Sequence, residues 1–287
     1  MNGGGVNEDI LAGQADAGAA LARIADALER LVPPGPAEAD WLGAPAYVWD
    51  RDGARAVPVL AAPPLDLLRG IDAQKETVVA NIARHASGHA AHDMLLWGSR
   101  GMGKSALLRA GTLAAQAHAG PIALVQIAPD ALDGMTRLFG VLARVDRRFL
   151  VYIDDLGFED GDSTGPRQLR SWLEGGVEAR PANVRLAVTA NRRAIVARHL
   201  SEQDDPINPR DAVDDRLALA DRFGLSIGFH ACSQDDYLAI VSGYANRFGL
   251  DFEAGDALEW AKRRGGRSGR VAWQYVTELA GRAGRAI

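Results

Sequence analysis

The sequence of residues 93–109 is DMLLWGSRGMGKSALLR, and no other stretch of the chain constrains its architecture as strongly. Residues 94–97 form a short apolar run of the kind that becomes a buried strand. Residues 98–105 then match the phosphate-loop pattern G-x-x-x-x-G-K-[ST] at every fixed position. Residues 105–115 are rich in Ala and Leu and contain no Pro, which predicts a helix. A strand, a glycine-rich turn and a helix in this order predict a nucleotide-binding site.

This phosphate loop would surround a polyphosphate with inward-pointing backbone N–H groups, and the dipole of the following helix favours the same anion. Lys104 is expected to reach the β- and γ-phosphates, and the hydroxyl of Ser105 is expected to be a ligand of Mg²⁺. The alternative is a glycine-rich turn without a ligand, which the flanking strand and helix disfavour. The loop residues that we expect to hold ATP or ADP are Gly98, Ser99, Arg100, Gly101, Met102, Gly103, Lys104, Ser105 and Ala106.

The composition of the 287-residue chain is that of a soluble globular protein, with 47% hydrophobic and 24% charged residues. The net charge of −5 gives no overall attraction to nucleic acid or to anionic membranes. The single cysteine, Cys232, cannot form an internal disulfide and agrees with a reducing compartment. The chain has no apolar run of 18 residues and no signal-peptide pattern. These features predict a cytoplasmic protein that does not span a membrane.

The chain divides into three predicted parts. Apolar residues at helical spacing predict a helix over 14–32, which either packs on its own domain or docks a partner. Ala46–Trp49 and Ala56–Leu60 flank a turn and are predicted to pair as a small hairpin. We expect an N-terminal helix and small accessory region over 1–62, a P-loop core over 63–230 and a helical lid over 231–287.

A second motif, RFLVYIDD at 148–155, predicts a buried strand with two carboxylates at its end. Because ligands bind at the carboxyl ends of parallel strands, both side chains should face the nucleotide. Asp154 is suited to hold Mg²⁺ through water beside Ser105, and Asp155 to orient or activate the attacking water. The acidic loop that follows, over 159–162, is expected to be solvated rather than to form a second metal site.

The remaining elements complete an α/β pattern. Strands are predicted over 121–127, 184–188 and 225–229, which makes five with the two already described. Asn191 follows one of them and could contact the γ-phosphate or the attacking water, although a simple turn-forming role is the alternative. Ser233 and Ser268 are predicted to cap helices of the C-terminal lid, which contains no predicted strand.

Two further groups of residues precede the phosphate loop. Ile71 lies one helix and one turn upstream, where many nucleotide-binding ATPases hold adenine, and is a candidate for the apolar wall of that pocket. Ordinary packing is the alternative for Ile71. His85, His89 and His92 lack Cys or carboxylate partners at metal-binding spacing, so we expect solvated or capping roles for them.

Five strands interleaved with helices and followed by a helical tail resemble the AAA+ ATPase architecture, over about residues 67–279. The resemblance implies a three-layer αβα sandwich with a five-stranded parallel sheet and a small C-terminal helical lid. It also implies a sensor-1 role for Asn191, an arginine-finger role in trans for Arg222, and a sensor-2 role at the phosphates for Arg270. The alternatives are an ion pair of Arg222 with a nearby Asp, and a solvated basic patch that includes Arg270. The catalytic candidates are therefore Lys104, Asp154, Asp155, Asn191, Arg222 and Arg270.

In finer detail the chain is similar to a bacterial AAA+ family of unknown function. The segments that carry this similarity are LLWGSRGMGKS, IDDLGFE, LEGGVEARP, ANRR, LADRFGL and GGRSGRVA. Two departures from most AAA+ motors matter. Asp155 stands where they carry Glu, as in the helicase-loader branch, and its shorter carboxylate predicts slow hydrolysis. Residues 128–135 contain no aromatic residue, which disfavours threading of a polypeptide through a pore.

The expected function is slow hydrolysis of ATP to ADP and phosphate with Mg²⁺, coupled to oligomerisation and to loading or remodelling of an unidentified protein partner. An arginine finger that reaches the γ-phosphate of a neighbouring subunit requires self-association, as a ring or open ring. One alternative is a nucleotide-dependent switch or scaffold with negligible turnover. Another is a DNA-linked ATPase, which the basic residues 262–270 and the loader-like carboxylate pair suggest.

Overall fold

The computed structural model describes residues 23, 39–157, 169–173, 180–191 and 220–287. The predicted helix over 14–32 lies outside these residues apart from residue 23, and so do the acidic loop over 159–162 and most of the segment before Arg222. Among the described helices, none combines the length and the apolar character that crossing a membrane requires.

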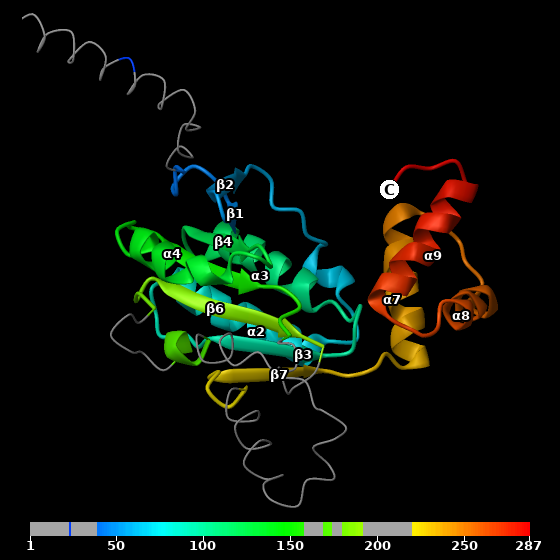
Figure 1. Ribbon diagram of the computed structural model, residues 1–287. Helices are drawn as coiled ribbons and strands as arrows, with labels where there is room; N and C mark the ends of the chain where they lie inside the picture. Colours follow the sequence, from blue (N-terminus) through cyan, green and yellow to red (C-terminus); the bar gives the residue numbers. More distant parts are fainter. Residues whose placement is uncertain (1–22, 24–38, 158–168, 174–179, 192–219) are drawn as a thin grey trace, which may run out of the picture.

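A single sheet forms the centre of the described structure, with the strand order β2-β1-β4-β5-β6-β3-β7 (Figure 1). The strands are β1 (Ala46–Asp50), β2 (Gly53–Val57), β3 (Met94–Gly98), β4 (Ile122–Ile127), β5 (Arg148–Ile153), β6 (Val184–Ala190) and β7 (Leu225–Phe229). The strands β3 to β7 are parallel wherever they pair, as the sequence predicts. Their almost continuous apolar runs suit strands that helices cover on both faces.

The N-terminal hairpin extends this sheet by two strands. β1 pairs antiparallel with β2 and parallel with β4, where Ala46 lies opposite Leu124. The second strand of the hairpin begins and ends three residues earlier than predicted, because β2 spans Gly53–Val57 and not Ala56–Leu60. Pro58 follows β2 and has no backbone N–H with which to continue the pairing.

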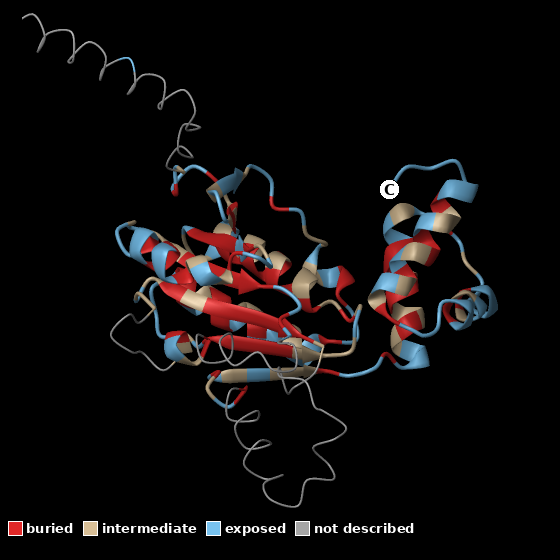
Figure 2. Ribbon diagram, viewed as in Figure 1, coloured by how far each residue is buried: buried red, intermediate tan, exposed pale blue. Residues whose placement is uncertain are grey.

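Helices cover both faces of the sheet, and Figure 2 shows the central strands almost entirely buried between them. The core helices are α2 (Asp72–Ala86), α3 (Lys104–His118) and α4 (Met135–Leu142), with 3-10 turns η1 (Leu65–Leu67) and η2 (Leu132–Gly134). Leu150 and Tyr152 of β5 pack on the side of α2 and α3, whereas Phe149 and Val151 pack on the side of α4. This alternation along one strand produces the predicted three-layer αβα sandwich.

The helical lid consists of α7 (Gln234–Phe248), α8 (Ala254–Arg263) and α9 (Gly269–Arg282). The hydroxyl of Ser233 accepts a hydrogen bond of 3.0 Å from the backbone N–H of Asp236 and caps α7. The hydroxyl of Ser268 accepts one of 3.2 Å from the N–H of Val271 and caps α9. Both caps are as predicted. Figure 1 shows the lid beside the end of the sheet where β3 enters the phosphate loop.

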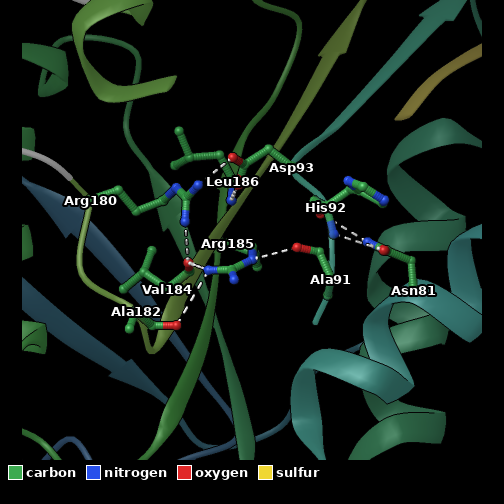
Figure 3. A network of polar contacts seen from close by, with 9 residues as sticks. All are labelled: Asn81, Ala91, His92, Asp93, Arg180, Ala182, Val184, Arg185 and Leu186. Carbon is green, nitrogen blue, oxygen red and sulfur yellow. Dashed lines mark hydrogen bonds and ion pairs between the residues drawn. The ribbon is translucent and has the colours of Figure 1, made fainter. Parts of the chain in front are cut away.

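A network of polar contacts joins β3 and β6 at their amino ends, the end of the sheet away from the lid (Figure 3). The carboxylate of Asp93 accepts hydrogen bonds of 2.7 Å from Arg180 and from the backbone N–H of Leu186. Burial raises the pKa of Asp93, although the positive charge of Arg180 opposes the rise. The network holds β3 and β6 in register, and the far ends of these strands lead to the phosphate loop and to Asn191.

His85 differs from its predicted solvated or capping role. It is 2% exposed and lies on the inner face of α2. Its Nε2 is 3.0 Å from the carbonyl oxygen of Phe149, so the neutral ring donates a hydrogen bond there. Burial lowers the pKa of His85 to about 4, which keeps the ring neutral at pH 7.

Candidate nucleotide-binding site

The phosphate loop connects β3 to α3 and contains three glycines with positive φ, of which Gly98 and Gly103 are fixed positions of the motif. Gly98 has a φ of 124°, and a Cβ there would lie 2.0 Å from the carbonyl oxygen of Phe229. That same carbonyl accepts a hydrogen bond of 2.9 Å from the N–H of Ser99, which fastens the loop to β7. Gly103 has a φ of 90° and ends the loop, because α3 begins at Lys104. The fixed glycines of the motif thus meet real steric requirements.

Lys104 is held across the loop. Its Nζ donates hydrogen bonds of 2.7 Å to the carbonyl oxygen of Gly98 and 2.9 Å to that of Ser99. Burial lowers the pKa of Lys104, and the carboxylates of Asp155 and Asp154 oppose this shift. The ammonium group is therefore positioned at the loop before any phosphate arrives.

A hydrogen-bonded group of oxygen atoms lies beside the start of α3. Ser105 Oγ donates to Asp154 Oδ1 at 2.8 Å, and Thr189 Oγ1 donates to the same oxygen at 2.6 Å. Burial tends to raise the pKa of Asp154, but hydrogen bonds, led by that from Thr189, outweigh it and hold the pKa below its ordinary value. Asp154 is therefore ionised at neutral pH, and its carboxylate and the serine hydroxyl are ligands of the type that Mg²⁺ prefers.

Asp155 has an unusual backbone conformation, with a φ of 52°. Its N–H donates a hydrogen bond of 2.8 Å to Thr189 Oγ1. Asn191 donates a hydrogen bond through Nδ2 to Asp155 Oδ1, and Arg100 Nη2 lies 3.8 Å from Asp155 Oδ2. Aspartate tolerates the left-handed region better than most residues, and these contacts turn its side chain toward the phosphate loop.

These groups line one cavity of about 930 Å³ between the core and the lid. Among the described residues, its walls carry more cations than carboxylates, since six basic side chains face Asp154 and Asp155. The basic side chains are Arg69, Arg100, Lys104, Arg109, Arg247 and Arg270. The larger apolar side chains of the wall are Leu67, Leu68, Ile71, Met102, Ile240, Tyr244, Phe248 and Trp273. A lining with both basic and apolar side chains suits a ligand with a polyanionic part and a flat, weakly polar part.

Most of the predicted site residues meet at this cavity. The residues among them that line it are Ile71, Arg100, Gly101, Met102, Gly103, Lys104, Ser105, Ala106, Asp154, Asp155, Asn191 and Arg270. Gly98 and Ser99 do not line the cavity, but their carbonyl oxygens accept the hydrogen bonds of Lys104, which does. Arg222 is different, because it precedes the amino end of β7, whereas the carboxyl end of that strand contacts the loop. Arg222 does not line this cavity, so its finger role in trans stays a prediction.

The lid touches the phosphate loop directly. The N–H of Arg270 donates a hydrogen bond of 3.2 Å to the carbonyl oxygen of Gly101. A Cβ at Gly101 would lie 2.8 Å from Ser268 Oγ, so the lid packs closely on the loop backbone. Arg270 thus enters the site on α9, a helix that its serine cap starts beside the loop.

The sequence interpretation missed several residues of the cavity. Thr189 bonds both acidic residues, and its only local signal is a hydroxyl near the end of β6. Arg109 was more predictable, because it lies four residues after Ser105 on α3 and its Nε donates to the Ser105 carbonyl oxygen at 3.3 Å. Arg247 and Tyr244 reach the cavity only because the lid packs there.

The largely parallel sheet, the phosphate loop, the paired carboxylates and the lid define an AAA+ P-loop protein. The profile of the family described as "Protein of unknown function (DUF815)" matches residues 43–283, and the chain belongs to this family. No protein of curated function matches the sequence significantly.

Solved structures agree with the fold. The RuvB Holliday junction branch migration motor of Thermotoga maritima matches with a TM-score of 0.51 and 16% identity, over 79% of this chain and 68% of that one. A variant of the same RuvB gives a TM-score of 0.52 and 18% identity, with the same coverage of both chains. At such low identity the likeness shows a common fold and no more.

Proposed function

We propose that this chain binds ATP with Mg²⁺ in the cavity between core and lid and hydrolyses it slowly to ADP and phosphate. The observation that carries the proposal is the convergence of Lys104, Ser105 and Asp154 in the lining of that cavity. An amine, a hydroxyl and an ionised carboxylate at a phosphate loop are the groups that nucleotide triphosphate binding with a metal requires.

The residues present fit Mg²⁺. Ser105 Oγ and Asp154 Oδ1 are 2.8 Å apart and open to the cavity, so either directly or through water they would hold the ion. Bound there, Mg²⁺ would neutralise charge on the β- and γ-phosphate oxygens.

The protein's own groups account for the rest of the reaction. Lys104 would bind phosphate oxygens, and Asn191 and Asp155 would orient a water in line with the γ-phosphorus. The water oxygen bonds to the γ-phosphorus as the bond to the β,γ-bridging oxygen breaks, and the carboxylate of Asp155 accepts the water proton. The products are ADP and inorganic phosphate.

The decisive measurement is phosphate release by the purified protein with Mg²⁺ and ATP. We expect slow turnover that Lys104→Ala abolishes and Asp155→Asn strongly reduces. Unchanged turnover in Asp155→Asn would remove its role as the base. An absence of ATP binding by the unaltered protein would overturn the proposal.

We further propose that nucleotide state is coupled to self-association and to a protein partner. The hydrogen bond between Gly101 and Arg270 supports such coupling, because a phosphate in the loop would shift a carbonyl that holds the lid. Light scattering in ATP and in ADP would test assembly. A pull-down with Asp155→Asn and Lys104→Ala in both nucleotides would test the partner, and identical results in all conditions would contradict the coupling.

Two other functions have specific support. The engagement of Asp155 by Asn191 and Arg100 favours a nucleotide switch with negligible turnover, for which tight ATP binding without phosphate release would be decisive. Exposed basic residues at 262–264 and at Arg267 favour a DNA-linked ATPase. Turnover that single- and double-stranded DNA leave unchanged at low salt would count against the second.

A further inference from the structure

Arg100 occupies one of the non-fixed positions of the phosphate-loop pattern, and its side chain forms an ion pair with Asp155. Its Nη2 lies 3.8 Å from Asp155 Oδ2, and the other oxygen of that carboxylate, Oδ1, accepts a hydrogen bond from Asn191. Each oxygen of Asp155 therefore faces a donor from the protein. A guanidinium that faces Oδ2 competes with water for that oxygen of the carboxylate.

The fixed member of this pair is Asp155. Its N–H is bound to Thr189 Oγ1 at 2.8 Å, and its φ of 52° sets the direction of its short side chain. The side chain of Arg100 is long and 75% exposed, so it can reorient without disturbing the core. Any exchange of partners would therefore move the guanidinium and leave the carboxylate in place.

A γ-phosphate would compete well for this guanidinium. Exposed ion pairs such as Arg100 with Asp155 contribute little, because water screens them. A phosphate offers several oxygens and a higher charge, and a guanidinium binds such groups through two parallel hydrogen bonds. Arg100 lies two residues after the first glycine of the loop, so the phosphates would lie within its reach.

We propose that Arg100 holds Asp155 when no γ-phosphate is present and transfers to the γ-phosphate when ATP binds, which frees Asp155 to act on water. The inference rests on the proposed function. Arg100 acts as a positioning residue that discriminates ATP from ADP, because ADP lacks the group that attracts the guanidinium away from Asp155.

The first test compares the affinities for a non-hydrolysable ATP analogue and for ADP, both with Mg²⁺. We expect Arg100→Gln to lower the ratio of analogue affinity to ADP affinity about tenfold, and Arg100→Lys to restore part of it. Arg263→Gln is the matched control, because it breaks an ion pair of nearly equal exposure. The side chains of Arg263 and Glu259 are 73% and 59% exposed, and those of Arg100 and Asp155 are 75% and 59% exposed. An unchanged ratio in Arg100→Gln overturns the inference while the proposed function stands. A protein that binds neither nucleotide overturns both.

The second test asks whether Asp155 competes for Arg100. Asp155→Asn should tighten binding of the ATP analogue about threefold in the otherwise unaltered chain, because Arg100 is no longer held. In the Arg100→Gln background the same substitution should have no such effect. An equal gain in both backgrounds would mean that Asp155 merely repels the phosphate, and it would overturn the exchange. Circular dichroism of each variant verifies that the fold is retained.

Discussion

The backbone N–H of Arg270 donates a hydrogen bond of 3.2 Å to the carbonyl oxygen of Gly101, and this contact joins the lid to the phosphate loop. The two residues belong to different parts of the molecule, because Gly101 lies in the loop after β3 of the core and Arg270 lies in the lid helix α9. Because Gly101 has a φ of 74°, its carbonyl direction depends on a conformation that other residues adopt only with strain. The position of the lid therefore depends on the conformation of the loop.

Substitution of Gly101 should loosen the lid. An alanine Cβ would meet Ser268 Oγ at 2.8 Å and the Cβ of Arg270 at 3.2 Å, in addition to about 1 kcal/mol of left-handed strain. We expect Gly101→Ala to weaken ATP affinity about tenfold, measured by calorimetry. Gly140→Ala is the control, because no atom lies within 4 Å of a Cβ there. Equal affinities of the two variants would show that the lid contact does not contribute to the site.

Thr189 should set the pH range in which the metal site works. Its hydroxyl donates to Asp154 and lowers that carboxyl's pKa, so metal binding should persist below the ordinary Asp range and be lost only as pH falls through the lowered pKa. Thr189→Val removes this donor, and the acid limb of the turnover profile should move to higher pH. We expect turnover at pH 7 to fall about tenfold, because Asp155 also loses its backbone partner.

The control for this prediction is Thr77→Val on α2, where the exposed hydroxyl bonds only to the Ala73 carbonyl oxygen of its own helix. That variant should retain the pH profile of the unaltered chain. If Thr189→Val also retained it, the hydrogen bond to Asp154 would not control the ionisation of the site.

Local sequence patterns predicted much of this molecule because the responsible contacts are local. Ser233 and Ser268 cap helices through residues three positions away, and Lys104 bonds to carbonyls five and six positions away. A pattern of residue types at short spacing can express such contacts. The order of strands and helices, the phosphate loop and the acidic pair were accessible for the same reason.

Contacts between distant segments were not accessible in this way. The pairing of Ala46 with Leu124 joins segments 78 residues apart, and neither segment carries a mark of the other. The end of β2 at Val57, by contrast, was predictable from the sequence, because the next residue is Pro58 and proline has no backbone N–H for strand pairing. Likewise, Thr189 acquires its role only when β5 and β6 lie side by side and bring it to Asp154.

Removal of Arg180 should destabilise the fold strongly. Its guanidinium is the charged partner of Asp93, a carboxyl that is only 7% exposed. Arg180→Ala would leave this carboxyl without its cation in a buried site, at a cost of about 3 kcal/mol in the free energy of unfolding. Arg282→Ala breaks an exposed ion pair with Glu278 and should cost less than about 1 kcal/mol. Urea unfolding of both variants checks the contrast, and similar losses would show that the buried pair has no special importance.

His85 should make the protein less stable in mild acid. Its folded pKa of about 4 is below the value of 6.5 expected in the unfolded chain, so the unfolded state binds the proton first as pH falls. The stabilisation is fully present above pH 6.5 and decreases as the pH falls toward 4. Between pH 7 and pH 5 the free energy of unfolding should fall by about 2 kcal/mol from this residue.

His85→Gln isolates this effect, because the amide can still donate to the Phe149 carbonyl oxygen while carrying no titrating proton. The variant should lose less stability than the unaltered chain between pH 7 and pH 5, whereas the exposed His89→Gln should behave like the unaltered chain. Urea unfolding at both pH values gives the comparison. If all three proteins lost the same stability, the buried ring would not be the source of the acid sensitivity, and other groups of the fold would have to supply it.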